Sequence, residues 1–417
     1  MNLELKSSAR APKEPPRSIL MIKAHSMGVG DLLRSSAAWR ALKNKWPDVQ
    51  LHLLFLSKHE GYPTEGLIAD HPLLSSAQFL TIQRGHPGLP KSERPKVPFL
   101  KLASEVRQAA VRVSADWIID FEPYGARTSV LSWVAAKSSG AKSLGVAQVW
   151  IRSLFYTQCA PSVQEFAKDR GLELPLEYTN RDFVVLSAWG IERGVLPIEL
   201  GETTQGVLAR NLLLEQLKVL ENQSSIDLSN LSMNGNSGFN QTPGSTQSQT
   251  QRQKLNKTQN KTLLVGLNIG CGTSDALHKR PDLQHLAECV NLVNQNYPAQ
   301  WVLTGAPNEL KVNEEFIKLY ESLYPNAAQA MVNFAGRCSL SGLTGVICAC
   351  DVFISTDSGP YHMSVGLKCP TLVWFTYAER SSYHEVKWCV RLIQPQAAEF
   401  LKAFEQLTDR KKLANLI

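Results

Sequence analysis

Short apolar runs alternate with amphipathic stretches along most of the chain. Ser18–Ala24 (SILMIKA) is a compact apolar run, which predicts a buried strand. Residues 32–43 then place apolar side chains at helical spacing ahead of Pro47, and residues 50–56 (QLHLLFL) predict a second strand. The chain therefore opens with a β-turn-α-β unit, which is typical of a parallel sheet covered by helices.

The same alternation continues through both halves of the chain. Further strands are expected at residues 116–120, near Leu144, and at 262–268, 300–304, 351–355 and 371–375. Helices are expected at residues 100–113, from about 128, and at 178–191, 283–296 and 340–350. Because strands and helices keep alternating, the pattern predicts an α/β protein with doubly wound sheets.

Length and local composition predict two domains. The 417 residues exceed the size of one typical domain. Residues 221–261 consist mainly of Asn, Gln, Ser and Thr, which predicts a disordered linker, and the Pro-rich residues 1–16 predict a disordered tail without a secretory signal. We therefore expect one domain at 17–220 and a second at 262–417.

Charge and cysteine content narrow the class of protein. The formal net charge of +7 is spread along the sequence without basic runs that interleave aromatic residues, so an anionic small ligand or a membrane surface is expected rather than nucleic acid. The eight cysteines form no CxxC pair, which predicts reduced thiols in a cytoplasmic protein and no zinc site. No stretch approaches the roughly 20 apolar residues of a membrane span, so any membrane contact is expected to be peripheral.

Two polar turns at the ends of expected strands could carry chemistry. Residues 356–360 (TDSGP) precede a helix that we expect to begin near His362, and the free amides of a helix start suit an anion such as phosphate. Asp31 occupies the corresponding place in the first unit, where a parallel sheet presents its reactive groups. Both turns have a simpler explanation, because Asp31, Asp357 or Ser358 could serve only as helix N-caps.

The first turn does not match the common nucleotide-binding motifs. Gly28 and Gly30 supply the first two glycines of GxGxxG, but Leu33 stands at the third position and no acid ends the second strand. The chain also lacks the GxxxxGK[ST] sequence of a P-loop. These observations argue against a nicotinamide-dependent enzyme and against an ordinary P-loop NTPase.

Eight sequence motifs follow one another in order along the two halves of the chain. The motifs of the second half are VGLNIGCG, HKRPD, TGAPNE, FAGRCSLSGL and STDSGPYHMSVGLKCPTLVWF. Those of the first half are SILMIKAHSMGVGDLLRSSAAWRALKNKWPDVQLHLL, DWIIDFEPYGARTSV and LSAWGI. This ordered set resembles glycosyltransferase family 9, the bacterial heptosyltransferases. The resemblance covers most of residues 18–390 apart from the linker, and it implies a GT-B fold in which two Rossmann-like domains face each other across a cleft.

The resemblance also implies an activity. Such a protein is an inverting glycosyltransferase that moves a heptose or similar sugar from a nucleoside diphosphate sugar, ADP-linked in this family, to a lipopolysaccharide-type or other glycan or glycolipid acceptor. The family works at the cytoplasmic face of the inner membrane and needs no cofactor and no catalytic metal. The absence of a DxD pair from the sequence agrees with metal-independent transfer.

The resemblance assigns roles to individual residues. Asp31 matches the proposed general base, Lys279 with Arg280 would face the diphosphate, and Glu309 would hold the ribose hydroxyls. A helix N-terminus is expected to keep Asp31 ionised and weakly basic. The other positions expected to bind the donor are Gly270, Thr273, Gly305, Thr356, Asp357, Ser358, Gly359 and His362. Those expected on the acceptor side are Gly28, Gly30, Glu122 and Arg127.

Each of these residues also has a structural explanation, and the sequence departs from the family at three places. Lys279 and Arg280 could be solvated, Glu309 could be a helix N-terminal acid, and His362 could be packed in the core. The departures are Ser36-Ala37 where the family often has a proline, Glu122 where glutamine is common, and the segment from Thr376, which lacks a GPTDP-like turn. Two alternatives therefore stay open, which are a nucleotide-sugar-binding protein without activity and a GT-B-fold sugar-nucleotide epimerase.

Overall fold

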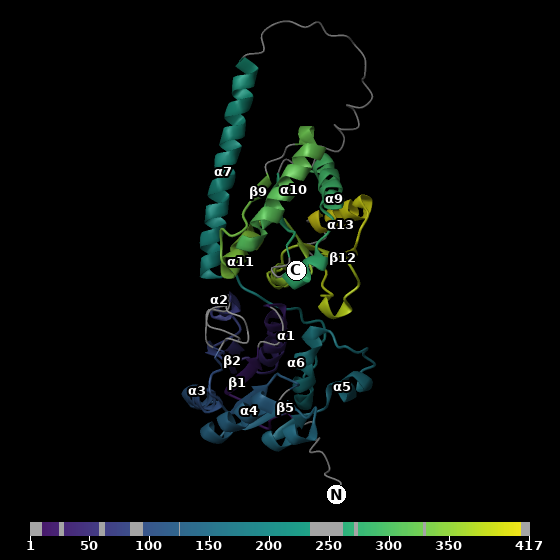
Figure 1. Ribbon diagram of the computed structural model, residues 1–417. Coiled ribbons are helices and arrows are strands. Elements are labelled where there is room, and N and C mark those ends of the chain that lie inside the picture. The colour runs from purple at the N-terminus through teal and green to yellow at the C-terminus, as the bar shows by residue number, and fades with distance from the viewer. Residues whose placement is uncertain are drawn as a thin grey trace.

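The computed structural model describes residues 11–24, 29–57, 63–83, 95–124, 126–233, 262–270, 274–327 and 331–409, and side chains of the long helix α7 only as far as residue 220. Two six-stranded sheets form two domains, the first purple to teal and the second green to yellow in Figure 1. Their orders are β3-β2-β1-β4-β5-β6 and β12-β11-β10-β7-β8-β9, with parallel pairing throughout. Both orders are those of a Rossmann-like doubly wound sheet, so the predicted fold class is confirmed.

The strands are short and mostly buried. Those of the first sheet are β1 Ser18–Ala24, β2 Gln50–Ser57, β3 Ser76–Thr81, β4 Trp117–Asp120, β5 Lys142–Val146 and β6 Gln158–Ala160. Those of the second sheet are β7 Leu263–Asn268, β8 Ala299–Thr304, β9 Met331–Asn333, β10 Val352–Thr356, β11 Thr371–Phe375 and β12 Cys389–Ile393.

Helices connect the strands and cover both faces of each sheet. In the first half they are α1 Val29–Lys45, α2 Pro63–Ile68, α3 Phe99–Arg112, α4 Ala126–Ser139, α5 Val163–Asp169, α6 Tyr178–Leu186 and α7 Thr204–Met233, with 3₁₀ turns η2 Trp150–Phe155 and η3 Ser187–Trp189. In the second half they are α9 Leu283–Asn296, α10 Leu310–Leu323, α11 Leu340–Ala349, α12 Gly359–Gly366 and α13 Ala397–Thr408, with η4 Ser274–Lys279, η5 Pro307–Glu309, η6 Pro325–Ala327 and η7 Arg380–Ser382.

One apolar core runs from the first domain into the second. It joins Trp39 on α1 and Leu213 on α7 with Ile347 on α11 and Met363 on α12. The outer face of the first sheet has its own core beneath α3 and α4, and the outer face of the second sheet has one beneath α9, α10 and α13. Apolar burial at about 25 cal/mol per Å² therefore favours contact between the two domains as well as the folding of each.

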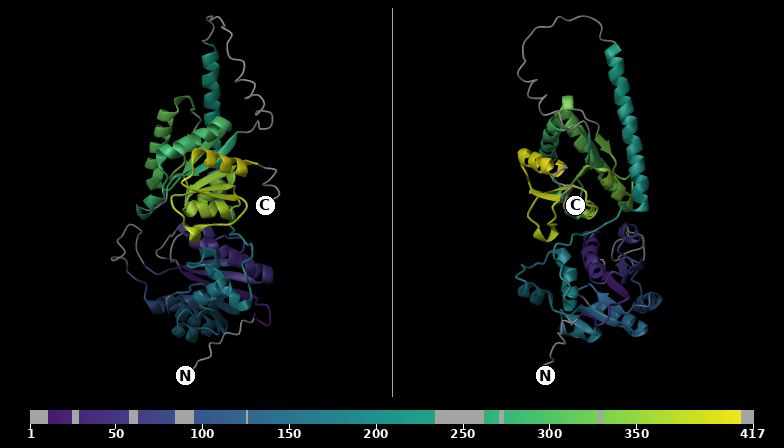
Figure 2. Two further views of the ribbon diagram at one scale, coloured as in Figure 1. Left: turned by 90° about the vertical axis from the view of Figure 1, so that its right-hand side faces the viewer. Right: turned by 180° about the vertical axis from the view of Figure 1, so that it is seen from behind.

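Helix α7 packs with the second domain although the sequence predicts a first domain that ends at residue 220. Gly206 lies directly against Gly345 of α11, since a Cβ on Gly345 would come within 1.8 Å of the Gly206 carbonyl oxygen. Thr203, just before α7, donates to the Ser341 carbonyl at 2.8 Å. The helix also continues to Met233, so residues 221–233 are helical rather than linker, and 234–261 lie outside the described residues. Figure 2 shows α7 alongside the second domain, with its C-terminal end standing beyond it.

Most strongly patterned elements occur where the sequence predicts them. The strands Ser18–Ala24 and Thr371–Phe375 and the helix Leu283–Asn296 have the predicted bounds. The helix expected near His362 begins three residues earlier, at Gly359. The segment predicted as one helix over 178–191 is α6 followed by the 3₁₀ turn η3, and it ends at Gly190 with φ 64° as glycine permits.

Candidate active site

Asp31 lies in the first turn of α1, just beyond the carboxyl end of β1. The carboxylate is half-buried, and its Oδ2 atom is buried without a hydrogen-bond partner among the described residues. The charged neighbours that act on it are Lys23, Arg34, Arg181 and Asp182. A buried carboxylate oxygen without a partner is costly, which makes it a candidate for contact with a ligand.

Burial raises the pKa of Asp31 above its ordinary value, although the charges of Lys23 and Arg34 act against this rise. The sequence predicted the opposite direction, a carboxylate made weakly basic by the helix N-terminus. That prediction is wrong, because the removal of water from around the carboxylate outweighs the nearby positive charges. Asp31 is a stronger base than an exposed aspartate.

A buried ion pair stands beside Asp31 at the same edge of the sheet. Lys23 Nζ lies 2.6 Å from Asp182 Oδ1, with Lys23 at the end of β1 and Asp182 on α6. Burial alone would lower the pKa of Lys23, but the charges of Asp182 and Glu122 outweigh it and the pKa is raised. Sequence reasoning missed this pair, although a lysine inside the apolar run SILMIKA is a signal that could have pointed to it.

Glu122, expected on the acceptor side, belongs to this cluster. Its Oε1 atom accepts a hydrogen bond from the Ala24 amide at 3.0 Å. Burial raises the pKa of Glu122 to about 7, with Lys23 opposing the shift. Among the other acceptor-side positions, Arg127 is exposed at the start of α4, and Gly28 lies outside the described residues. The cluster therefore holds a titrating carboxyl and a basic carboxylate at the edge of one sheet.

The turn between β10 and α12 is the facing element in the second domain. Asp357 Oδ2 lies 2.6 Å from Lys279 Nζ, so these two candidates pair with each other. The Ser358 hydroxyl donates to Asn268 Oδ1 at 3.1 Å, and the Thr356 hydroxyl donates to the Gly270 carbonyl at 2.9 Å. These bonds fix the turn against the end of β7 and leave Gly359 as the first residue of α12.

Glu309 occupies a tight corner of the second domain. It is 3% exposed, and its Oε2 atom accepts from the Ala306 amide at 2.7 Å. A Cβ on Gly270 would fall 1.6 Å from Glu309 Oε1, so only glycine leaves room for the carboxylate there. Arg280 Nη2 lies 4.0 Å from the same Oε1 atom. Gly305 adjoins the Glu309 side chain, and Thr273 lies outside the described residues.

The two turns meet where α1 and α12 come together. A Cβ on Gly30 would lie 2.2 Å from His362 Cδ2, and one on Gly359 would lie 3.6 Å from Val29 Cβ. His362 shares a hydrogen bond of 2.8 Å with His384, and burial holds its pKa well below the ordinary value, so the ring is neutral. The start of α1, which carries Asp31, and the start of α12 therefore lie next to each other where the two domains meet.

Arg34 joins the two domains one helical turn beyond Asp31. Its side chain is buried, and its two terminal nitrogens donate to the Ser381 and Ser382 carbonyls at 2.9 and 3.0 Å. The guanidinium also lies over the Tyr178 ring, 5.1 Å from its centroid. Its electrostatic partners include both Asp31 and Asp357. The sequence analysis did not single out Arg34, since its partners lie in the other domain.

Comparison with known proteins gives a family match for the second half of the chain. The family model described as Glycosyltransferase family 9 (heptosyltransferase) matches residues 226–413. The chain is a glycosyltransferase with a family 9 domain. No curated protein sequence matches the chain significantly.

Solved structures share the architecture at low sequence identity. The glycosyl transferase family 9 structure from Veillonella parvula DSM 2008 is 14% identical with a TM-score of 0.60, covering 94% of this chain and 97% of that one. ADP-heptose lps heptosyltransferase II of E. coli is 15% identical with a TM-score of 0.56, covering 95% and 99%. E. coli heptosyltransferase WaaC with ADP is 14% identical with a TM-score of 0.55, covering 94% and 99%. The glycosyltransferase therefore has the GT-B fold.

One departure from the family pattern has a structural role in this glycosyltransferase. Ser36, where a proline is common, accepts a hydrogen bond from the Glu199 amide at 2.7 Å, and Ala37 beside it is fully buried. Glu199 also pairs with Arg40 through two bonds of 2.7 Å. The first helix is thus tied to the segment that crosses between the domains. Thr376, at the third departure, donates to the His278 carbonyl at 2.9 Å.

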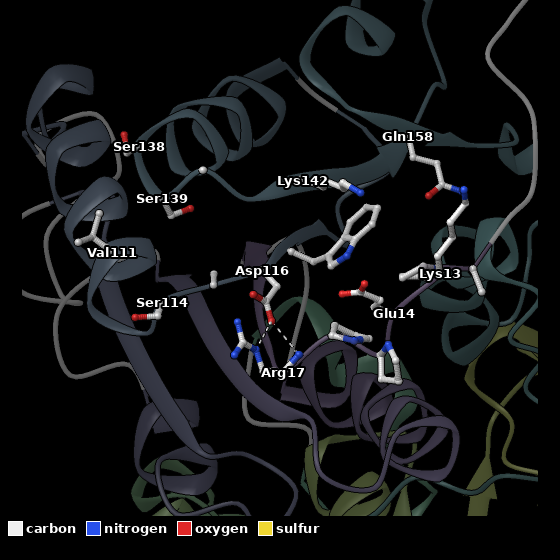
Figure 3. Close-up of a pocket in the computed structure, with 17 residues that line it drawn as sticks. Lys13, Glu14, Arg17, Val111, Ser114, Asp116, Ser138, Ser139, Lys142 and Gln158 are labelled. Atoms are coloured by element: carbon white, nitrogen blue, oxygen red, sulfur yellow. Dashed lines mark hydrogen bonds and ion pairs between the residues drawn. The ribbon is translucent and has the colours of Figure 1, made fainter.

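A hollow lies at the opposite edge of the first sheet from Asp31. Trp117, Asp116 and Lys142 line it at the amino ends of β4 and β5, and Arg17 bonds to Asp116 across it (Figure 3). Open α/β sheets bind their ligands at the carboxyl ends of the strands. This hollow is therefore not the active site of the glycosyltransferase.

Proposed function

We propose that the protein transfers a heptose or similar sugar from an ADP-linked donor to a lipopolysaccharide-type or other glycan acceptor, with inversion and without a metal. Asp31 is the general base, and Lys279 with the start of α12 stabilises the leaving diphosphate. Glu309 holds the donor ribose, and Glu122, Arg127 and Gly30 lie on the acceptor side. The ADP present in the related E. coli WaaC structure supports the choice of donor nucleotide.

The observation that carries the proposal is the approach of Asp31 to the β10–α12 turn across the domain contact. Gly30 and His362 touch, and Arg34 interacts electrostatically with Asp31 on one side and Asp357 on the other. Inverting transfer needs a base on the acceptor and a cationic group on the leaving phosphate, placed on opposite sides of the transferred sugar. The start of α1 supplies the base, and Lys279, paired with Asp357 of the β10–α12 turn, supplies the cation.

In the proposed reaction the acceptor hydroxyl attacks the anomeric carbon as its proton passes to Asp31. The new C–O bond forms while the bond from the anomeric carbon to the diphosphate oxygen breaks, and the nucleoside diphosphate leaves with the electron pair. A base with a raised pKa accepts the proton more readily than an exposed aspartate. Burial of Asp31 therefore favours this step once the carboxylate is ionised.

Lys279 and the amides of α12 stabilise the negative charge that develops on the leaving group. Lys279 is held by Asp357 at 2.6 Å before a donor enters. A diphosphate would compete with Asp357 for the ammonium group, while the helix N-terminus adds its own partial positive charge. Removing one such preorganised donor typically costs about 10²–10³ in rate.

The test is sugar transfer from ADP-heptose to a deacylated lipopolysaccharide core, followed by ADP release. Asp31→Asn should reduce kcat by more than about 10²-fold while the dissociation constant for ADP stays within about threefold. Asp169→Asn, which alters an exposed acid of the same domain, should leave both quantities unchanged. Full turnover by Asp31→Asn would refute the role of this residue, and failure to bind ADP would refute the choice of donor.

A cytoplasmic location with peripheral contact at the inner membrane also belongs to this proposal. Among the described helices, none is both long and apolar enough to cross a bilayer. The net charge of +7 suits an acceptor or a surface that carries negative charge. Fractionation of cells into membrane and cytosol, with and without a high-salt wash, tests this part of the proposal separately.

A further inference from the structure

The segment from Val149 to Leu154 has an inverted burial pattern. Arg152 is 1% exposed, whereas the apolar side chains around it are turned to solvent, with Trp150 71% and Leu154 66% exposed. Val149 and Ile151 are also exposed. Apolar side chains on an ordinary surface segment point inward and charged ones outward, so this arrangement requires a specific cause.

Arg152 holds the segment in this orientation. Its guanidinium donates to the Glu122 carbonyl at 2.5 Å and to the Tyr156 hydroxyl at 2.7 Å, and it lies 3.3 Å from Asp120 Oδ2. Asp120 is fully buried at the end of β4 and also accepts from Tyr156 at 2.6 Å. A buried ion pair with several hydrogen bonds fixes the 3₁₀ turn η2 firmly, so its exposed apolar side is part of the built structure.

The apolar surface continues onto the neighbouring helix α4. Trp133 of α4 is 43% exposed, and its ring makes an edge contact with Phe155 at 6.5 Å between centroids. Lys137 lies four residues further along α4, on the same face as Trp133, and is exposed. Figure 1 shows α4 and β5 in the part of the first domain that lies away from the second, so the domain contact leaves this side open.

The exposed charges of this stretch are positive. The sequence from Pro123 to Gln164 contains no aspartate or glutamate, and its exposed cations are Arg127, Lys137 and Lys142, of which Lys137 shares a helix face with Trp133. Arg152 is buried against Asp120, and Lys142 lines the hollow at the amino ends of β4 and β5. Exposed tryptophan and leucine side chains flanked by cations are the composition of surfaces that lie in the interface of an anionic bilayer.

We propose that the face formed by Trp133, Lys137, Val149, Trp150, Ile151 and Leu154 docks on the surface of an anionic lipid bilayer. The face is fixed by Arg152 to the Glu122 loop, which is the acceptor side of the proposed active site. Docking would therefore place the acceptor end of the first domain next to molecules that are anchored in the bilayer. The proposal deepens the proposed function, but binding to lipid needs neither a donor nor turnover.

Flotation of the full-length protein with vesicles tests the proposal. Wild-type protein should float with vesicles of phosphatidylglycerol and phosphatidylcholine and much less with phosphatidylcholine alone. The double variant Trp150→Ser, Leu154→Ser should lower the partition coefficient at least about 20-fold, since two large apolar side chains are lost. Lys137→Glu should lower it about fivefold or more, and only with anionic vesicles.

A matched control and an association test complete the experiment. The double variant Val195→Ser, Leu208→Ser removes two side chains that are 97% and 66% exposed elsewhere, and it should float like the wild type. Thermal unfolding should be unchanged in every variant, because the substituted side chains are exposed. Should the Trp150→Ser, Leu154→Ser variant misfold, Lys137→Glu still tests the proposal. Equal flotation of all variants would overturn the proposal. So would a lipid-free dimer, seen by light scattering, that the Trp150 and Leu154 substitutions dissociate.

Discussion

Arg34 offers the sharpest test of how the two domains act together. Its guanidinium makes two hydrogen bonds to carbonyls of η7 in the other domain. Hydrogen bonds that involve a charged group contribute about 1.5–3 kcal/mol each, and the return of the freed guanidinium to water offsets part of the sum. We therefore expect Arg34→Met to weaken the domain contact by about 2–4 kcal/mol, which corresponds to roughly 30- to 700-fold.

The assay is the initial rate of sugar transfer as a function of donor concentration. Arg34→Met should lower kcat/KM by as much as this roughly 30- to 700-fold weakening, since the domain contact then persists in a smaller fraction of molecules. The kcat/KM of Arg34→Lys should lie between those of wild type and Arg34→Met, because one ammonium cannot repeat the two parallel bonds of a guanidinium. Arg40→Met is the matched control, since Arg40 lies on the same helix in a half-exposed pair with Glu199, worth at most about 1 kcal/mol.

The pH profile separates this role from simple loss of stability. The charge of Arg34 acts to lower the pKa of Asp31, although burial leaves that pKa raised overall. In molecules whose domains stay in contact, removing Arg34 should raise it further, so the acidic limb of kcat at saturating substrates should move to higher pH. The reasoning is refuted should Arg34→Met keep kcat/KM within about threefold of wild type, or should the acidic limb stay in place while the rate falls.

Three further predictions concern the interior of each domain. Gly270→Ala places a Cβ 1.6 Å from Glu309 Oε1, so ADP affinity measured by calorimetry should drop at least about tenfold. Gly201→Ala is the control, because its Cβ would lie 3.5 Å from Pro72 Cδ, and it should bind ADP as the wild type does. Lys23→Met leaves Asp182 buried without its partner, so it should lower the free energy of unfolding, measured in urea, by about 3–5 kcal/mol. Arg170→Met, which breaks an exposed pair, should lower it by less than about 1 kcal/mol. Because the pKa of Glu122 in the folded chain, about 7, exceeds its ordinary value, the folded state holds this proton longer and stability falls as pH rises through that range. Between about pH 5 and pH 8, the free energy of unfolding should therefore fall by about 1–3 kcal/mol less in Glu122→Gln than in wild type. An equal fall in both proteins would contradict the assignment.

The predictability of each element follows from how deeply it is buried. The central strands β1 and β11 are apolar and buried along almost their whole length, so the sequence places them correctly. Most positions of the edge strands β3 and β12 are only partly buried, and the edge strand β6 has only three residues. A strand with one neighbour needs few apolar side chains, so its pattern resembles that of a loop.

The site residues that the sequence could predict are those defined by local contacts, and the ones that it missed depend on distant contacts. Asp31 and the turn at Asp357 could be found because a helix start after a parallel strand is a local signal. Arg34 could not, since its carbonyl partners lie 347 and 348 positions away in the sequence. The basicity of Asp31 was mispredicted for a related reason, because burial depends on the packing of both domains and a helix N-terminus does not reveal it.

The spacing of Asp31 and Arg34 couples the basicity of the carboxylate to the contact between the domains. Both residues lie within one turn of α1, and Arg34 reaches its η7 partners only where the two domains meet. Separation of the domains would expose both side chains to water, which would return the pKa of Asp31 towards its ordinary value. Asp31 would then keep its raised pKa only while the β10–α12 turn lies against the start of α1.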